Sequence, residues 1–119
     1  MLRTAMFGLC LALCTPLPAA ASDATRIQSR DAFVSLVKDR ALTRFGITLT
    51  VLPDGAITGR AFGRPVRGDW NWRGSYFCRN LWFGDEPLGP NCQVVELRGN
   101  ALRFIADEGR GDHADLRLR

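Results

Sequence analysis

The sequence lacks most of the motifs on which the common enzyme classes depend. It has one histidine, His113, few serines, and neither a GxSxG nor a GxGxxG motif. The first motif presents the nucleophile of α/β hydrolases, and the second forms the turn that binds a dinucleotide pyrophosphate. We therefore expect no nicotinamide or other cofactor, and no motif assigns a catalytic residue.

Cysteine is also scarce, and only Cys78 and Cys92 lie beyond the first 21 residues. Structural zinc sites take four Cys or His ligands, so two cysteines and a single histidine do not predict a metal site. Their spacing is not that of a CxxC redox motif. An even number of cysteines in an oxidising compartment is typical of a disulfide. The sequence therefore predicts a Cys78–Cys92 bridge.

The chain has no concentrated stretch of one charge. Its formal net charge is +4, and acidic residues are interspersed with the arginines. Nucleic-acid-binding domains usually carry a basic stripe or patch, so we expect no nucleic-acid partner.

Long apolar runs are absent too, whereas a membrane-spanning helix needs about 20 such residues. The run from Ala5 to Leu13 is short, follows Arg3 and precedes the small residues Ala19–Ala21. This order is typical of a secretory signal peptide, so we expect residues 1–21 to be removed and the mature chain to begin at Ser22. The predicted location is periplasmic or secreted.

Cys10 and Cys14 raise the alternative of a lipid-modified N-terminus. Each follows a leucine, however, whereas a lipid-modified cysteine normally follows a small residue. The flanking residues therefore favour a soluble exported product without a membrane anchor.

The remaining chain predicts a mainly β domain of the α+β class over residues 29–119, after a flexible lead at 22–28. Ser29 is a suitable N-cap for an N-terminal helix, Phe33 and Val37 have helical spacing, and Gly46 is a suitable end. Period-two alternation then predicts about seven short strands, near residues 47–52, 56–62, 66–73, 75–81, 92–98, 101–107 and 112–119. Short connections require an antiparallel meander, which we expect to form a curled sheet or a small open barrel.

Aromatic residues concentrate in "DWNWRGSYFCRN", residues 69–80. Trp70 and Trp72 alternate with charged or amide residues, which is typical of a strand with one face in the core. Tyr76 lies on the next strand. These three residues are core aromatics or, alternatively, part of a pocket for an apolar ligand.

The segment "RNLWFGDEPLGPN", enclosed by the predicted disulfide, contains two prolines and two glycines. This composition predicts a turn-rich loop instead of a continued strand. A disulfide at its base would limit its freedom, so that less entropy is lost on binding. We expect Trp82, Phe83, Asp85 and Leu88 to form part of a partner-binding surface.

His113 is the one candidate for a general base. Asp112 and Asp115 are close enough in sequence to orient it. A hydrolase using His113 is therefore an alternative, although an exposed histidine on the polar face of a strand is the simpler interpretation.

Three stretches, "GDWNWRGSYFCR", "GPNCQVVELRGNALRF" and "DEGRGDHADLRLR", carry a resemblance over residues 66–119. The chain resembles a group of small exported bacterial proteins of uncharacterised function, some of which are labelled dihydrodipicolinate reductase. The resemblance implies an exported β domain and supplies no catalytic residues. A reductase of that name would need a nicotinamide-binding fold, which this chain lacks.

The sequence thus favours a non-catalytic exported module that binds an unknown protein or small ligand. Two alternatives stay open. One is an enzyme, either a reductase or a hydrolase using His113, and the other is an inhibitor of a secreted enzyme.

Overall fold

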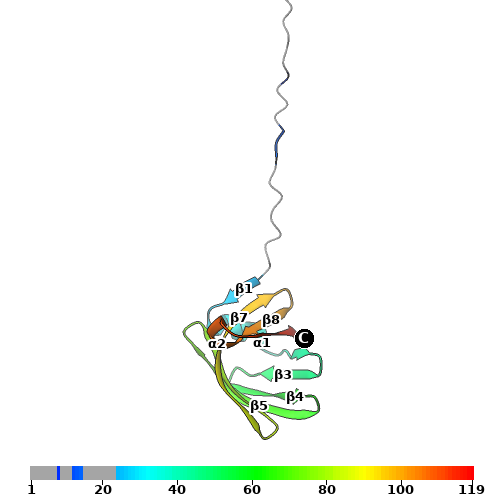
Figure 1. Cartoon of the computed structure of the whole chain (residues 1–119), viewed down its shortest axis with the longest axis vertical. Coiled ribbons are helices and arrows are strands. Elements are labelled where there is room, and N and C mark those ends of the chain that lie inside the picture. Colours follow the sequence, from blue (N-terminus) through cyan, green and yellow to red (C-terminus); the bar gives the residue numbers. More distant parts are fainter. Residues whose placement is uncertain (1–7, 9–11, 15–23) are drawn as a thin grey trace, which may run out of the picture.

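Eight antiparallel strands close into a barrel, and a ninth strand pairs with one of them (Figure 1). The computed structural model describes residues 8, 12–14 and 24–119. The predicted signal peptide therefore lies outside the described residues, apart from positions 8 and 12–14. The barrel strands are β2 (Leu42–Arg44), β3 (Ile47–Val51), β4 (Ala56–Ala61), β5 (Arg64–Arg73), β6 (Tyr76–Phe83), β7 (Glu86–Arg98), β8 (Ala101–Ile105) and β9 (His113–Leu118).

Each barrel strand from β2 to β9 pairs antiparallel with the next along the chain, as the meander prediction requires. The barrel closes because β9 also pairs with β2, through Leu42 opposite Leu118 and Thr43 opposite Arg117. The expected curled sheet or open barrel is therefore corrected to a closed one. Closure removes the free edges that a curled sheet would expose.

The expected flexible lead at residues 22–28 is wrong at residues 24–27, and its first two residues lie outside the described part of the chain. Residues 24–27 form β1 (Ala24–Ile27), which pairs antiparallel with Val95–Arg98 at the end of β7. Ile27 is 6% exposed and belongs to the core, so burial of its side chain holds the segment in place.

Helix α1 (Arg30–Val37) follows β1, so the folded domain opens with a strand and not with the predicted N-terminal helix. Ser29 caps it, because its side chain accepts a hydrogen bond from the amide of Ala32 at 3.2 Å. The helix ends at Val37, well before Gly46. Asp39 takes a left-handed backbone conformation with φ of 59°, which a continuing helix does not allow.

The buried face of α1 fills one end of the barrel. Phe33 is fully buried, and its ring centroid lies 5.2 Å from that of Trp70, 5.3 Å from that of Trp72 and 5.0 Å from that of Phe77. Aromatic pairs at such separations add to the stabilisation from buried area. One helix thus closes the barrel base and supplies the centre of its core.

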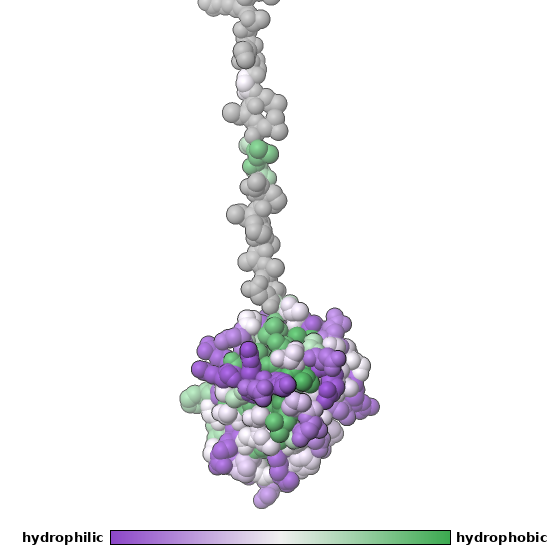
Figure 2. All heavy atoms as spheres, turned by 180° about the vertical axis from the view of Figure 1, so that it is seen from behind, coloured by the Kyte–Doolittle hydropathy of each residue, from purple (hydrophilic) through white to green (hydrophobic). Residues whose placement is uncertain are grey.

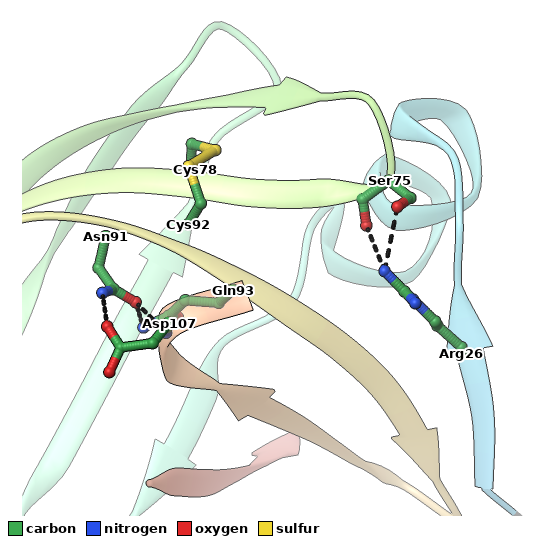
Figure 3. The surroundings of a disulfide bond; sticks show 7 residues. All are labelled: Arg26, Ser75, Cys78, Asn91, Cys92, Gln93 and Asp107. Carbon is green, nitrogen blue, oxygen red and sulfur yellow. Dashed lines mark hydrogen bonds between the residues drawn. A yellow bond between two sulfur atoms is a disulfide. The ribbon is translucent and has the colours of Figure 1, made fainter. Parts of the chain in front are cut away.

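Contacts outside the core attach the α1 region to the turns at the same end. Arg30 donates a hydrogen bond to the carbonyl of Pro53 at 2.6 Å, in the β3–β4 turn. Arg26 of β1 donates to the hydroxyl of Ser75 at 3.0 Å, in the β5–β6 turn (Figure 3). Since the strands alternate in direction, turns 45–46, 62–63 and 84–85 and segment 106–112 lie at the opposite end.

The Cys78–Cys92 disulfide is confirmed and joins two directly opposed residues of β6 and β7 (Figure 3). The Cα atoms are 4.0 Å apart. The bridge lies in the middle of a ladder, so it reinforces the pairing of β6 with β7.

Removing the bridge should destabilise the barrel without changing its fold. For a closed loop of about 15 residues, chain-entropy arguments give about 3 kcal/mol. We expect the double variant Cys78→Ala/Cys92→Ala to lose about that much free energy of unfolding in urea titrations relative to the oxidised protein. An unchanged midpoint and slope would show that the bridge contributes nothing measurable.

Candidate ligand-binding cavity

The barrel interior holds a cavity of about 310 Å³ towards the end opposite α1. Its wall is mainly apolar, because the inward-facing positions of the strands are apolar. Six of the lining residues are Leu49, Val51, Ile57, Leu81, Phe104 and Leu116.

Gly68 lies between two residues of the cavity wall and allows β5 and β6 to approach each other closely. It occupies an inward-facing position of β5, opposite Ile57 of β4 and Leu81 of β6. A Cβ atom at Gly68 would lie 2.1 Å from the carbonyl oxygen of Asn80. Glycine therefore permits a close approach of β5 and β6, and its position contributes no side chain to the core.

Arg79 is the one basic side chain that comes from the middle of a strand into this apolar wall. It lies between Phe77 and Leu81 on the inward face of β6, opposite Trp70 of β5. Its Nη1 donates a hydrogen bond to the carbonyl oxygen of Gly89 at 2.7 Å. Burial lowers the pKa of Arg79, because a charged guanidinium is less well solvated there.

Gln93 and Asn91, inward-facing on β7, connect the cavity to segment 106–112. The amide of Gln93 donates to the side-chain oxygen of Asn91 at 3.2 Å. That same oxygen accepts from the backbone amide of Asp107 at 3.1 Å, and the Asn91 amide donates to the Asp107 carboxylate at 2.8 Å (Figure 3). Asn91 is therefore the centre of a small polar network at the cavity mouth.

This network holds an unusual turn. Asp107 and Glu108, in the short α2 (Ala106–Gly109), have φ values of 54° and 57°. Non-glycine residues pay about 1–2 kcal/mol each in the left-handed region. The hydrogen bonds from Asn91 offset part of that cost and fix the turn beside the mouth.

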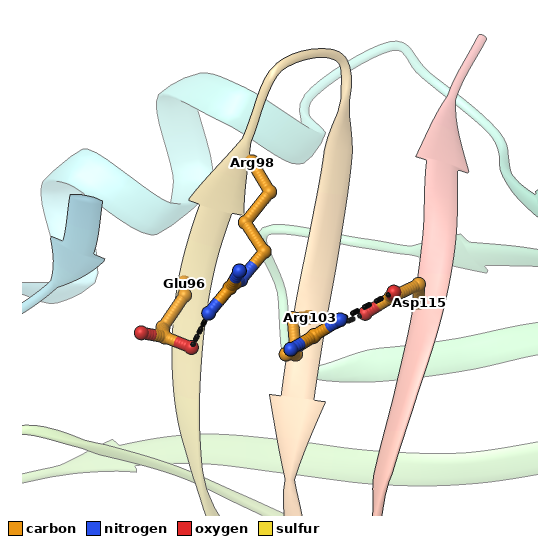
Figure 4. A network of polar contacts seen from close by, with 4 residues as sticks. All are labelled: Glu96, Arg98, Arg103 and Asp115. Atoms are coloured by element: carbon orange, nitrogen blue, oxygen red, sulfur yellow. Dashed lines mark hydrogen bonds and ion pairs between the residues drawn. The ribbon is translucent and has the colours of Figure 1, made fainter. Parts of the chain in front are cut away.

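Asp112, His113 and Ala114 also line the cavity at its mouth. His113 is exposed there. The described serines belong to the α1 region and to the β5–β6 turn, at the other end of the barrel, so none of them lies beside His113. Asp115 does not orient it either, since its carboxylate accepts two hydrogen bonds from Arg103 at 2.8 and 3.0 Å (Figure 4).

The barrel wall is thinly paired on one side of the cavity. β2 has three residues and pairs with β9 at two positions, next to which Ala41 and Arg119 exchange two further backbone hydrogen bonds, whereas β8 pairs with β9 at five positions. Leu42, Leu49, Ala114 and Leu116 line the cavity on both sides of this seam. Strand edges with few hydrogen bonds open more readily than fully paired ones, so we expect this seam to open more readily than the rest of the barrel wall.

A wider groove of about 830 Å³ runs along the outer face of β2, β3, β8 and β9. Arg44, Arg117 and Arg119 line it, together with Asp115. The hydrogen bond from Arg103 holds the pKa of the Asp115 carboxyl below its usual range. Figure 4 shows the Arg103–Asp115 pair beside the Glu96–Arg98 pair, in which Nη2 of Arg98 lies 3.2 Å from Oε1 of Glu96. The groove faces outward and is lined by polar and apolar groups in similar proportion, whereas the interior cavity is lined mainly by apolar ones.

The structure places the predicted aromatic residues at the opposite end from the cavity mouth. Trp70 is buried and Trp72 half-buried, both against Phe33 of α1. The indole nitrogen of Trp70 donates to the carbonyl of Leu52 at 2.8 Å. Tyr76 lies on the outer face, with the Arg26 guanidinium 5.4 Å from its ring centroid. None of the three lines the cavity.

The predicted turn-rich loop is wrong, because β6 continues through Phe83 and β7 begins at Glu86. A shift of register between Leu81 and Trp82 accommodates the prolines. Trp82 and Phe83 are half-buried beneath Arg67 and Arg64, at 5.5 and 4.4 Å from the guanidinium carbons to the ring centroids.

Asp85 and Leu88 are exposed in this hairpin, Leu88 to 53%. Phe45 and Phe62, which the sequence analysis did not single out, are exposed to 93% and 66% on two other hairpin turns of the same end. The remaining surface is mixed, and Figure 2 shows a band of hydrophobic residues bordered by hydrophilic ones. A partner-binding role for the β6–β7 hairpin stays a prediction.

Within residues 24–119 and the four described positions before them, no three His, Cys, Asp or Glu side chains are grouped to hold a metal ion. In the same part of the chain, the helices are too short and too polar to cross a bilayer.

Replacing Asn91 should loosen the cavity mouth. Asn91→Ala removes the side chain that bonds Asp107, and each net hydrogen bond contributes about 1 kcal/mol. We expect faster hydrogen exchange at the Asp107 amide and a loss of about 1–2 kcal/mol of stability. Asn71→Ala, at an exposed position of β5, is the control; equal effects of both variants would contradict the role of Asn91.

Comparisons with known proteins add no assignment to this geometry. No protein-family model, no curated protein and no solved structure matches the chain. The arrangement of its own residues is therefore what carries a functional conclusion.

Proposed function

We propose that this protein is a non-catalytic exported binding protein whose barrel cavity holds a small, largely apolar ligand. The observation that carries the proposal is the cavity of about 310 Å³, with its apolar wall and few inward polar groups. Small-molecule sites commonly combine such a wall with a few polar groups that orient the ligand.

The cavity volume limits the size of the ligand. Binding pockets range from about 300 to 1,000 Å³, so this one is near the lower limit. A water molecule takes about 30 Å³ of liquid, and 310 Å³ therefore corresponds to on the order of ten non-hydrogen atoms. A short alkyl chain or one small ring fits, whereas a long lipid chain would extend through the mouth.

Export and the absence of catalysis belong to the same proposal. The disulfide is compatible with an oxidising compartment, as is the order of residues at the N-terminus. His113 has no described serine beside it, and Asp115 is engaged by Arg103. Ligand binding requires only the cavity, whereas hydrolysis or reduction would also require catalytic residues or a cofactor.

Filling the cavity should abolish binding. In Ala114→Phe a ring would occupy the space beside Phe104, its partner across β8 and β9. With 1-octanol as the probe in isothermal titration calorimetry, we expect saturable binding with a stoichiometry near one. The Ala114→Phe variant should bind at least about tenfold more weakly, since a tenfold change corresponds to about 1.4 kcal/mol.

Thr58→Phe is the matched control, because Thr58 is exposed on the outer face of β4. It adds the same ring without entering the barrel and should leave the affinity for 1-octanol within about twofold. Both variants must melt as cooperatively as wild type. Absence of saturable binding of both 1-octanol and octanoate, or equal binding by folded Ala114→Phe, would refute the proposal.

A further inference from the structure

Arg79 is a half-buried cation that forms no ion pair with any carboxylate among residues 24–119. Its guanidinium has five N–H donors, and its one hydrogen bond to the described residues goes to the Gly89 carbonyl. Neither of the ion pairs found among residues 24–119 involves it. A half-buried cation without an anionic partner is costly, so it is rarely kept for stability alone.

The Arg79 guanidinium is the main charged group of the cavity. Among the described residues, Asp112 is the one carboxylate in the lining, and it is exposed at the mouth, where water screens its charge. Asp107, in the adjoining turn, accepts a hydrogen bond from Asn91. His113 faces the mouth beside Asp112 and adds no negative charge.

The neighbours of Arg79 define the rest of such a ligand. Phe77 and Leu81 flank it on β6, and Ile57, Leu49 and Leu116 form the wall further round the barrel. A ligand with an anionic group near Arg79 would therefore place the rest of its atoms in an apolar space. A planar guanidinium pairs with a carboxylate through two parallel hydrogen bonds, which fixes the orientation of both groups.

We propose that the cavity binds a small amphipathic carboxylate, such as a medium-chain fatty acid, with its carboxylate on Arg79 and its apolar chain in the barrel interior. The proposal rests on the proposed function of the cavity and adds to it the chemical class of the ligand. Gln93, buried beside Asn91 on the adjoining strand, supplies an additional polar group near the carboxylate.

The test compares octanoate with 1-octanol, which share a chain length but differ in charge. Their ten and nine non-hydrogen atoms suit a space for on the order of ten. Hydrogen bonds between charged groups are about twice as strong as neutral ones. We expect wild type to bind octanoate about 10- to 100-fold more tightly than 1-octanol in calorimetry at pH 7 and low salt.

Arg79→Gln should lower the affinity for octanoate at least about tenfold while leaving that for 1-octanol within about threefold. Arg79→Lys keeps the charge and should restore part of the preference. Arg73→Gln removes an exposed positive charge from the outer part of β5 and should change neither affinity. Asp112→Asn removes the one opposing charge at the mouth and should strengthen octanoate binding slightly.

The outcomes separate this inference from the function on which it rests. Saturable binding of both probes without a preference for octanoate, or a preference that folded Arg79→Gln retains, would overturn the role of Arg79 and leave the cavity function intact. If neither probe binds to wild type, both proposals fail.

Discussion

Packing of Phe33 into one end of the barrel is the contact on which the rest of the structure depends. This side chain is fully buried and lies within 5.3 Å, between ring centroids, of Trp70, Trp72 and Phe77. A small barrel has two ends at which apolar side chains would otherwise meet water. Because α1 covers one of them, the core concentrates there, and the opposite end is left with fewer large side chains.

That asymmetry explains why the tryptophans and the cavity occupy different parts of the same barrel, with Phe77 and Phe104 between them, in contact with Phe33 and in the cavity wall. The tryptophans of β5 reach towards α1, whereas Gly68 of the same strand faces the region of Leu81 and Ile57. Arg79 enters at the boundary between the two regions, opposite Trp70. The closed, aromatic end supplies stability, and the open end can then contain space and an inward charge that a core of this size would not otherwise tolerate.

The sequence predicted the features that depend on local pattern. Alternation along β5, the N-cap at Ser29 and the two remaining cysteines indicated strand faces, a helix start and a disulfide, and the structure has all three. Features that depend on distant pairing were missed. Residues 24–27 become a strand only because β7 offers an edge, and the prolines after Trp82 are accommodated only by a shift of register against β7. Barrel closure depends on the pairing of β2 with β9, two strands far apart in the sequence, which no local pattern reveals.

The inward position of Arg79 had a signal in the sequence, because Phe77 and Leu81 alternate around it on a strand. An arginine at such a position is easily taken for a surface residue, and only the barrel shows that nothing negative faces it from the described strands. The cavity itself had no signal, since empty space depends on how side chains from six or more strands meet. Gly68 alone, read as a weak point of a strand, gives no indication of the volume around it.

The central claim is that the end opposite Phe33 contains an accessible apolar cavity. Methyl-resolved NMR of the oxidised protein, with leucine and valine methyl groups labelled and 1-octanol added, tests it most directly. We expect saturable shifts at Leu49, Leu81 and Leu116, which line the cavity, with little change at Val34 and Val37 of α1. Shifts confined to the exposed Leu88, or equally large at the cavity-lining leucines and at the valines of α1, would contradict the central claim.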